Sequence, residues 1–300
     1  MKTIALVTAV AATGHDEDLA PLLAACNAAG LRARIVAWDD ATVSWGRFDL
    51  ALLRSPWDYT ERLGEFLAWC GRAQQVTALL NPLEVVRWNT DKHYLAELQA
   101  AGVPVVATVY VEPEAEPLEA LQAFLASEAA AEFVVKPAVS AGARDTQRYS
   151  RAQDFGAGNH IAGLLEQGRS VMLQAYLDSV DSLGEVALVY FDGQFSHAIN
   201  KGALLHPDQP ATTTPHASGE ISPRQADPCE RQLAETVLSA LASLLQLPAP
   251  PAYARIDLLR DHAGQPRLLE LELIEPSLFF AHAPGSAERF AANLARHLNA

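Results

Sequence analysis

Three carboxylates near the C-terminus are the residues in this chain best suited to chemistry. Asp257 lies within residues 255–259, and Glu270 and Glu272 lie within residues 268–273. Both segments are short and aliphatic, which predicts two β-strands. The polar stretch between them contains Gly and Pro and predicts the turn of a hairpin.

Side chains alternate between the two faces of a strand, so Glu270 and Glu272 are expected on the same face. Pairing about the turn would bring Asp257 opposite or nearly opposite Glu270. The other face of the second strand would then carry Leu269, Leu271 and Leu273. The pattern therefore predicts three carboxylates converging on one side of a hairpin.

Carboxylates held this close repel one another and are costly to desolvate unless they find a partner. A hard divalent cation would relieve that cost, and oxygen ligands suit Mg²⁺ that arrives with the phosphates of a nucleotide. The alternative interpretation is a solvated acidic face on an edge hairpin.

Two lysines upstream supply the matching positive charge. Lys136 ends the apolar run 133–137, where a buried ammonium needs an anionic partner, and Lys92 stands near a predicted helix start. Ser140 and Gly142 belong to a loop of small residues whose free backbone N–H groups resemble those of a loop that covers phosphates.

Composition limits what else the chain could bind. Lys plus Arg is 22 and Asp plus Glu is 36 among 300 residues, a net charge of −14, which argues against nucleic acid and anionic membranes as partners. Cys26, Cys70 and Cys229 are odd in number and widely spaced, as expected for reduced thiols in a cytoplasmic protein. No apolar run is long enough to predict a membrane span.

The first 80 residues alternate predicted strands and helices, which indicates a parallel sheet with helices on its faces. Polar loops at 13–18 and 54–59 follow the first and third strands, where ligands bind in such sheets. The first strand is not followed by a G-x-G-x-x-G pattern, which argues against a nicotinamide-dependent oxidoreductase.

The rest of the chain mixes strands and helices. Asn89 or Thr90 is expected to cap a helix that runs to Ala101, and a hairpin is expected about Asp192-Gly193. Residues 203–228 lack periodicity and predict a loop over a site. Further strands are expected at 133–137 and 171–177, and helices at 117–131 and 234–245.

Several motifs of this sequence, taken in chain order, resemble those of the ATP-grasp superfamily. They are Lys92, Lys136, residues 174–177, Gly184-Glu185, Arg255-Ile256-Asp257 and Glu270-Leu271-Glu272. Residues 53–59, 81–82, 87–92 and 271–279 further resemble the subgroup containing the O-ureido-D-serine cyclo-ligase of D-cycloserine biosynthesis.

The resemblance implies an α/β fold in which ATP lies between two α+β lobes. Residues 1–88 would form an N-terminal parallel-sheet domain on the substrate side. Residues 89–176 would form the small lobe and residues 177–300 the catalytic lobe. Superfamily members are often dimers, so a homodimer is one expectation.

The resemblance also implies roles for individual residues. Lys92 and Lys136 would hold phosphates under the loop of Ser140 and Gly142. The adenine would meet Gln174, Ala175, Tyr176 and Leu177, and the ribose would meet Asp181 or Glu185. Mg²⁺ would bind Asp257, Glu270 and Glu272, with Glu272 standing where the family usually has Asn.

Arg255 and Lys201 would contact the transferred phosphoryl group or the acyl intermediate. A small amino-acid substrate would be recognised by the N-terminal loops and by residues across the cleft. The candidates are His15, Asp16, Arg54, Ser55 and Asp58, with His197, Thr214 and Ser218 opposite them. The alternative for His197 is a satisfied histidine on a half-buried strand, and Trp57 is the one tryptophan not assigned to the core.

The implied reaction is ATP-dependent conversion of a carboxylate to an acyl phosphate, followed by attack of a nitrogen. In the cyclo-ligase, the substrate's own ureido-oxy nitrogen attacks and closes a five-membered ring. The alternatives are an intermolecular carboxylate–amine ligase of the glutathione-synthetase kind and a non-catalytic nucleotide-binding protein.

Overall fold

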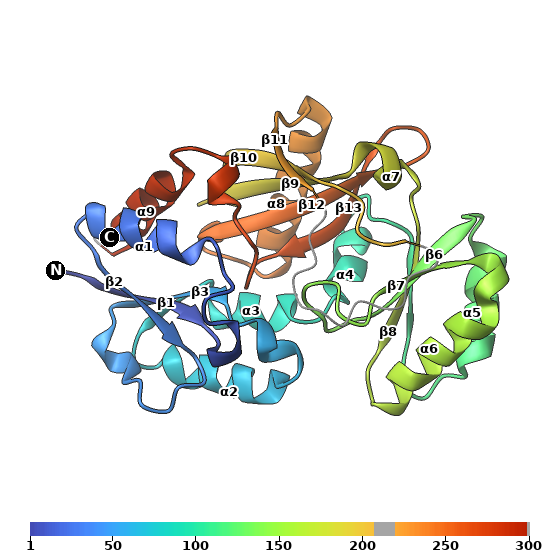
Figure 1. Cartoon of the computed structure of the whole chain (residues 1–300), viewed down its shortest axis with the longest axis horizontal. Coiled ribbons are helices and arrows are strands. Elements are labelled where there is room, and N and C mark those ends of the chain that lie inside the picture. The colour runs from blue at the N-terminus through green and yellow to red at the C-terminus, as the bar shows by residue number, and fades with distance from the viewer. Residues whose placement is uncertain (207–219, 299–300) are drawn as a thin grey trace.

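The computed structural model describes residues 1–206 and 220–298 and contains three sheets (Figure 1). The N-terminal sheet is parallel with strand order β2-β1-β3-β4. Its central strands β1 and β3 are nearly continuous aliphatic runs because helices or other chain segments cover both faces. The strands are β1 (Thr3–Thr8), β2 (Arg32–Ala37), β3 (Leu50–Ser55) and β4 (Ala78–Leu80), and the helices are α1 (Leu19–Ala28) and α2 (Leu63–Ala73).

The small lobe is an antiparallel sheet of order β5-β8-β6-β7 with two helices against it, on the right in Figure 1. Its strands are β5 (Thr108–Val111), β6 (Glu132–Pro137), β7 (Gln147–Ser150) and β8 (Val171–Ala175). Its helices are α5 (Pro117–Ser127) and α6 (Asp154–Glu166). The predicted strand 133–137 is confirmed as β6, with Lys136 in its buried part.

The large sheet carries the acidic hairpin and has order β11-β10-β9-β12-β13. Its strands are β9 (Glu185–Phe191), β10 (Gln194–Lys201), β11 (Ile221–Arg224), β12 (Tyr253–Arg260) and β13 (Pro266–Glu272). The hairpin predicted about Asp192-Gly193 is confirmed as β9 and β10. Helix α8 (Pro228–Leu244) begins earlier than predicted because Asp227 and Glu230 form a capping box and Pro228 opens the first turn.

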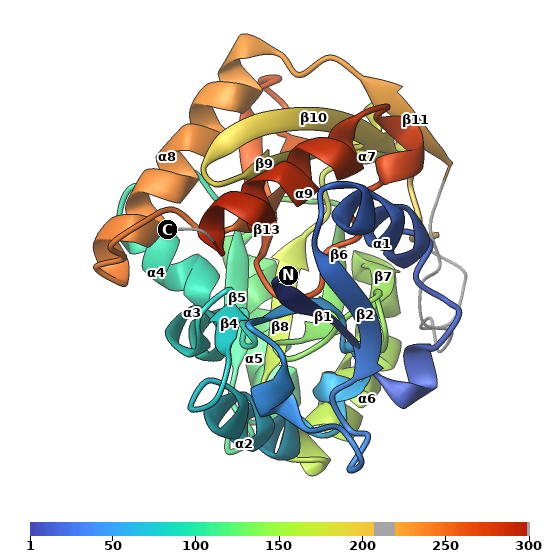
Figure 2. The ribbon, with the colours of Figure 1, turned by 90° about the vertical axis from the view of Figure 1, so that its left-hand side faces the viewer.

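The N-terminal sheet and the large sheet are joined by shared packing. Helix α9 (Ser286–His297) follows the large sheet but lies beside α1, as both views show (Figure 2). The stacked rings of Phe191 and Phe290, 4.4 Å apart, lie within this shared core. Short helices complete the fold: α3 (Leu83–Asn89), α4 (Tyr94–Ala100), α7 (Ser179–Leu183) and 3₁₀ turns at Val10–Ala12, Trp45–Arg47, Trp57–Thr60, Arg151–Gln153 and Phe280–His282. No helix among the described residues is both long and apolar enough to span a bilayer.

The acidic hairpin forms with the predicted register, and Asp257 lies directly opposite Glu270. A β-bulge follows, because Leu258 pairs with Leu268 and leaves Leu269 without an opposite residue. The extra residue places Leu269 on the cavity side with Glu270 and Glu272. The prediction that Leu269 faces away from the carboxylates was therefore wrong, since simple alternation holds only in an unbulged strand.

Strand β13 is at the edge of its sheet, yet side chains occupy its outward hydrogen-bonding groups. The Leu271 N–H donates to the Tyr94 hydroxyl, and Asn89 bonds the Leu271 C=O and the Leu273 N–H. Asn81 donates to the Leu273 C=O, and the main chain of residues 104–106 bonds both groups of Leu268. The predicted capping role of Asn89 or Thr90 was wrong, because α3 ends there and the next helix, α4, begins at Tyr94.

Candidate active site

A cavity of about 490 Å³ lies where the N-terminal loops, the small lobe and the large sheet meet. It brings together most of the candidate residues from all three parts of the chain. They are His15, Asp16, Lys92, Lys136, Ser140, Gly142, Gln174, Ala175, Tyr176, Leu177, Glu185, Lys201, Arg255, Asp257, Glu270 and Glu272. Thr214 and Ser218 lie outside the described residues.

Two buried lysines line the cavity, Lys92 from the turn before α4 and Lys136 from β6. Lys92 Nζ donates to the Ser140 carbonyl at 2.6 Å and lies 3.1 Å from Glu270 Oε1. Lys136 forms no ion pair within the described part of the chain, and burial lowers its pKa to about 8. An ammonium held in this way is completed by an anion from outside the protein, such as a phosphate.

The carboxylates of the hairpin are each matched by a nearby cation. Asp257 Oδ2 lies 2.8 Å from Arg255 Nη2 and 2.9 Å from Lys201 Nζ. Arg255 also pairs with Glu272, and Lys201 with Glu185. The site thus combines four acids with four basic side chains, counting Lys92 and Lys136.

Burial and these cations separate the pKa values of the acids. Burial would raise the pKa of Asp257, but Arg255 and Lys201 outweigh it and hold that pKa well below its usual range. Burial raises the pKa of Glu272 to about 8 and that of Glu185 to about 7, against the opposing effect of the same cations. Burial would also raise the pKa of Glu270, but Lys92 and Lys136 outweigh it and lower that pKa, so Asp257 and Glu270 are the permanent anions of the cluster.

Gly184 lets Glu185 reach this cluster. Its φ is +75°, and a Cβ there would lie 2.7 Å from the Lys201 carbonyl oxygen. Only glycine fits this close approach of α7's end to β10.

The donor set suits Mg²⁺ only together with outside ligands. Residues 1–206 and 220–298 contain no group of three or more His, Cys, Asp or Glu side chains placed to hold a metal alone. Mg²⁺ in nucleotide sites is held by one or two carboxylates together with phosphates and water rather than by a protein cage. Asp257 and Glu270, on paired strands, meet that requirement.

One end of the cavity is lined by apolar side chains. Tyr176 and Leu177 pack there with residues of the small lobe and the hairpin, in a cluster of Val106, Val134, Val180, Leu205, Leu259 and Leu269. Gln174 lines it and donates from Nε2 to Thr108 Oγ1 at 2.9 Å.

Asp181 lies behind this apolar surface rather than in the cavity. Its carboxylate accepts two hydrogen bonds from Arg148 and one from the Tyr176 hydroxyl. Arg148 also stacks 3.6 Å over the Tyr176 ring and pairs with Glu132. The sequence did not point to Arg148, because a single arginine in a short strand forms no pattern.

The opposite end of the cavity is built by the N-terminal loops and the segment after β13. Asp18 accepts hydrogen bonds from the N–H groups of Leu278, Phe279 and Phe280, at 2.5, 3.0 and 2.9 Å. Trp57 Nε1 donates to the Glu275 carbonyl at 3.1 Å, so this tryptophan, singled out from the sequence, does line the cavity. These contacts fix residues 275–280 to the N-terminal domain.

Four predicted substrate residues have other partners in the structure. Arg54 is 1% exposed and donates to the Pro276 carbonyl, and Ser55 donates to Thr8 Oγ1. Asp58 accepts from Trp38 Nε1 and pairs with Arg62, on the far side of the loop from the cavity. The His197 ring is hydrogen-bonded to the Leu278 carbonyl. This agrees with the alternative interpretation, in which His197 is a half-buried histidine with a partner in the protein. All four support the loops without lining the cavity.

Tyr59 and Glu275 belong to this end of the cavity but were missed from the sequence. Both are buried, and their side chains are hydrogen-bonded to each other. Glu275 stands in Ile-Glu-Pro-Ser, just after the strand, and its signal was an acid in an apolar setting.

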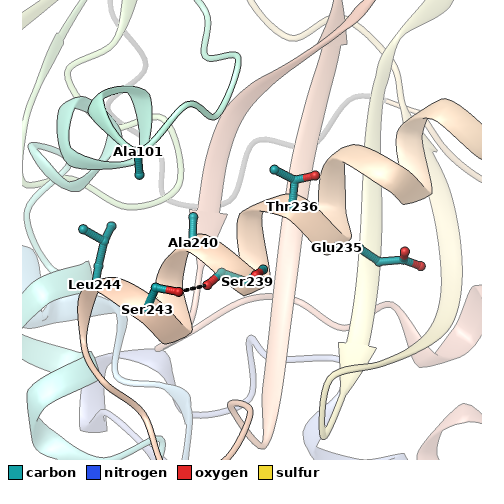
Figure 3. Close-up of a pocket in the computed structure, with 7 residues that line it drawn as sticks. All are labelled: Ala101, Glu235, Thr236, Ser239, Ala240, Ser243 and Leu244. Carbon is teal, nitrogen blue, oxygen red and sulfur yellow. Dashed lines mark hydrogen bonds between the residues drawn. The ribbon is translucent and has the colours of Figure 1, made fainter.

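A second hollow, of about 540 Å³, lies on the outer surface between α4 and α8 (Figure 3). Its polar groups are mostly hydroxyls that donate to carbonyls of their own helix, α8. Thr236 donates to the Gln232 carbonyl and Ser243 to the Ser239 carbonyl. Glu235 is its one charged lining residue, so the hollow does not gather groups that could perform chemistry.

Comparisons with known proteins show which family this chain belongs to. Residues 4–81 match the family described as the N-terminal domain of D-cycloserine synthetase DcsG. The chain is 44% identical to the cycloserine biosynthesis protein DcsG of Streptomyces lavendulae over 299 residues, 99% of each chain. The chain belongs to the DcsG family.

Solved structures show that this chain shares the fold of ATP-grasp ligases. A crystal structure of D-cycloserine synthetase DcsG superposes with a TM-score of 0.93 at 44% identity, over 99% of each chain. D-alanine–D-alanine ligase from Bacillus anthracis gives 0.67 at 15% identity, over 98% of this chain and 95% of that one, and shows the shared fold. The ATP-grasp ligase PsnB, solved with a minimal precursor, Mg and ADP, gives 0.65 at 18%, over 99% and 98%.

The predictions of an α/β ATP-grasp fold and of an ATP-grasp ligase in the D-cycloserine synthetase group are confirmed. The assignment of roles to single residues stays a prediction.

Proposed function

We propose that this enzyme uses ATP and Mg²⁺ to close O-ureido-D-serine to the D-cycloserine ring. The observation that carries the proposal is one continuous cavity of about 490 Å³. It is lined by a buried lysine with no ion pair among the described residues, by the carboxylate–cation cluster and, at its other end, by the acids Asp16 and Glu275. The likeness to DcsG over 99% of the chain supplies the choice of substrate.

Lys92 and Lys136 hold the phosphates of ATP under the loop of Ser140 and Gly142. The adenine lies on the apolar surface of Tyr176 and Leu177, with Gln174 beside it, and Glu185 is the candidate for the ribose side. Asp257 and Glu270, with Glu272, hold Mg²⁺, which neutralises phosphate charge. Residues 1–88, 89–176 and 177–300 act as the three units that enclose these ligands.

Arg255 and Lys201 stand where the cavity passes from phosphate to substrate. Both already hold the Asp257 carboxylate, so their charges are fixed in place before the reaction begins. They stabilise the charge that develops as the substrate carboxylate takes the phosphoryl group. The amino group of the substrate faces Asp16, a half-buried acid in the wall contributed by the N-terminal loops.

Ring closure is favoured because both reacting ends belong to one molecule. The enclosed end of the cavity holds the acyl phosphate near the ureido-oxy nitrogen, and such proximity contributes on the order of 7–11 kcal/mol to intramolecular reactions. Hydrolysis by one water then removes the carbamoyl group from the ring nitrogen as CO₂ and ammonia.

The test is to incubate the enzyme with ATP, Mg²⁺ and O-ureido-D-serine, with no other amine, and to measure ADP and the cyclic product. ADP and D-cycloserine in equal amounts are expected. A strict requirement for a second amine would instead show an intermolecular ligase, and nucleotide binding without any ADP release would show a non-catalytic protein.

A further inference from the structure

Glu275 is a buried cavity acid that has no part in the proposed roles above. It is 8% exposed and lines the cavity three residues beyond Glu272. Within the described part of the chain it forms no ion pair, because the nearest cations are committed elsewhere: Lys92 to Glu270, and Arg255 to Asp257 and Glu272. A buried carboxylate without its own cation is costly, so it marks a functional group more often than a structural one.

The position of Glu275 is fixed by the loop after β3. The Tyr59 hydroxyl bonds its carboxylate, and Trp57 Nε1 donates to its main-chain carbonyl at 3.1 Å. Arg54 Nη2 donates to the next carbonyl, that of Pro276, at 2.5 Å. Three contacts from the end of β3 and the loop after it therefore hold the carboxylate toward the cavity, as expected for a group that must meet a substrate atom.

We propose that Glu275 is the base that accepts the proton of the attacking nitrogen, and that Tyr59 is its positioning residue. This inference rests on the ring closure proposed above. In that step the ureido-oxy nitrogen bonds to the acyl carbon and the bond from that carbon to the phosphate oxygen breaks. Inorganic phosphate leaves with the electron pair, and the N–H proton passes to a Glu275 carboxylate oxygen.

The surroundings of Glu275 tune it for this task. Burial raises its pKa to about 7, and the hydrogen bond from Tyr59 acts in the opposite direction. The further charged groups that act on it are Lys92, Arg255, Glu270 and Glu272. A base is most effective when its pKa lies near the working pH, so about half of the carboxyl groups are ready to accept a proton at neutrality.

Binding the substrate ammonium is the other role open to this acid, and the arrangement favours it less. An ammonium beside Glu275 would add a third cation facing Lys92 and Arg255. Asp16, in the wall contributed by the N-terminal loops, faces one cation, Arg54, together with a second acid, Asp18, so an ammonium meets less repulsion there. The two roles differ in which step they affect, so one variant separates them.

The experiment uses Glu275→Gln, whose amide still accepts the Tyr59 hydrogen bond, and traps the acyl phosphate with hydroxylamine. Cyclic product is expected to fall on the order of 100-fold, the usual contribution of a general base. ADP release and hydroxamate formation with hydroxylamine should stay within about twofold of wild type, because that nucleophile needs no base of its own. Glu235→Gln, on the outer surface, is the matched control and should change neither.

A parallel loss of hydroxamate with a raised KM would overturn the proposal in favour of ammonium binding, and unchanged product formation would also overturn it. Wild-type enzyme that releases no ADP with this substrate would instead refute the proposed function itself.

Tyr59→Phe gives an independent test that does not need the Gln variant to fold. Product formation in wild type should rise with pH to a plateau above about 7, because the ionised carboxylate is the base. Tyr59 favours the ionised form, so its removal should shift that rise to higher pH. An unshifted profile would mean that Tyr59 is only structural and would contradict the proposal.

Discussion

The two ends of the cavity differ in what their buried polar side chains bind. At the proposed nucleotide end, most acids and bases come from strands of the two lobes and form ion pairs, with Asp257 between Arg255 and Lys201. At the substrate end, buried polar groups bind main chain, as Asp18 does with residues 278–280, and Glu275 has no ion pair among the described residues.

The difference reflects what each end must do. A nucleotide brings several negative charges and a metal. Its site therefore needs charged side chains that stay in position when these ligands bind and leave. A small amino acid brings few charges, and its site needs shape, which comes from joining two domains rigidly. Substitutions that remove a charge should therefore reduce activity most at the nucleotide end. Substitutions that break hydrogen bonds between the two domains, such as those of Asp18, should act most on the substrate end.

Asp257→Asn should have the largest effect, because it removes a permanent anion of the cluster and leaves Arg255 and Lys201 partly unmatched. ADP release should fall on the order of 1,000-fold. The melting temperature should be recorded alongside, since activity near wild type in a folded variant would remove Asp257 from the metal site.

Lys136→Met should rank second, with kcat/KM for ATP lowered about 100-fold. The pH dependence provides a sharper test. The protonated amine binds phosphate, and its pKa in the empty site is about 8, so ATP affinity in wild type should fall as the pH rises above about 8. Equilibrium binding of ATP across pH 7–9.5 measures this, and the Met variant should show no such fall.

Asp18→Asn should act on the substrate end alone. An amide NH₂ in place of one oxygen would face main-chain N–H groups, so the free energy of unfolding should drop by about 2–3 kcal/mol. The KM for the amino acid should rise while the KM for ATP stays unchanged. Urea unfolding and separate titrations of the two substrates check this, and an equal rise in both KM values would contradict the division between the ends.

Asp58→Asn should have the smallest effect, although the sequence suggested a substrate contact. Its carboxylate pairs with Arg62, a partly exposed residue outside the cavity. A loss of about 1 kcal/mol of stability is expected, with both KM values within about twofold of wild type. A selective rise in the amino-acid KM would restore Asp58 to the substrate site.

The nucleotide end could be predicted because its signals are local. Alternation within residues 268–273 and a turn of defined length were enough to place Asp257 opposite Glu270. The same reasoning failed at Leu269, because a bulge adds one residue to a strand without changing the pattern of residue types.

The substrate end could not be predicted because its contacts join distant parts of the chain. Asp18 and the Leu278 amide are 260 residues apart in the sequence. Nothing in the polar loop 13–18 indicates that this acid binds the main chain of residues 278–280. Arg54 and His197 are residue types common in binding sites, and only the packed structure shows that main-chain carbonyls occupy them.

The side chains along the outer edge of β13 have a consequence for assembly. An edge strand with free main-chain groups can recruit a strand from another molecule, which leads to swapping or aggregation. Here Asn81, Asn89 and Tyr94 take the positions that an incoming strand would need. The strand that carries Glu270 and Glu272 is therefore closed to strand addition, and self-association at this edge would have to proceed through side-chain surfaces.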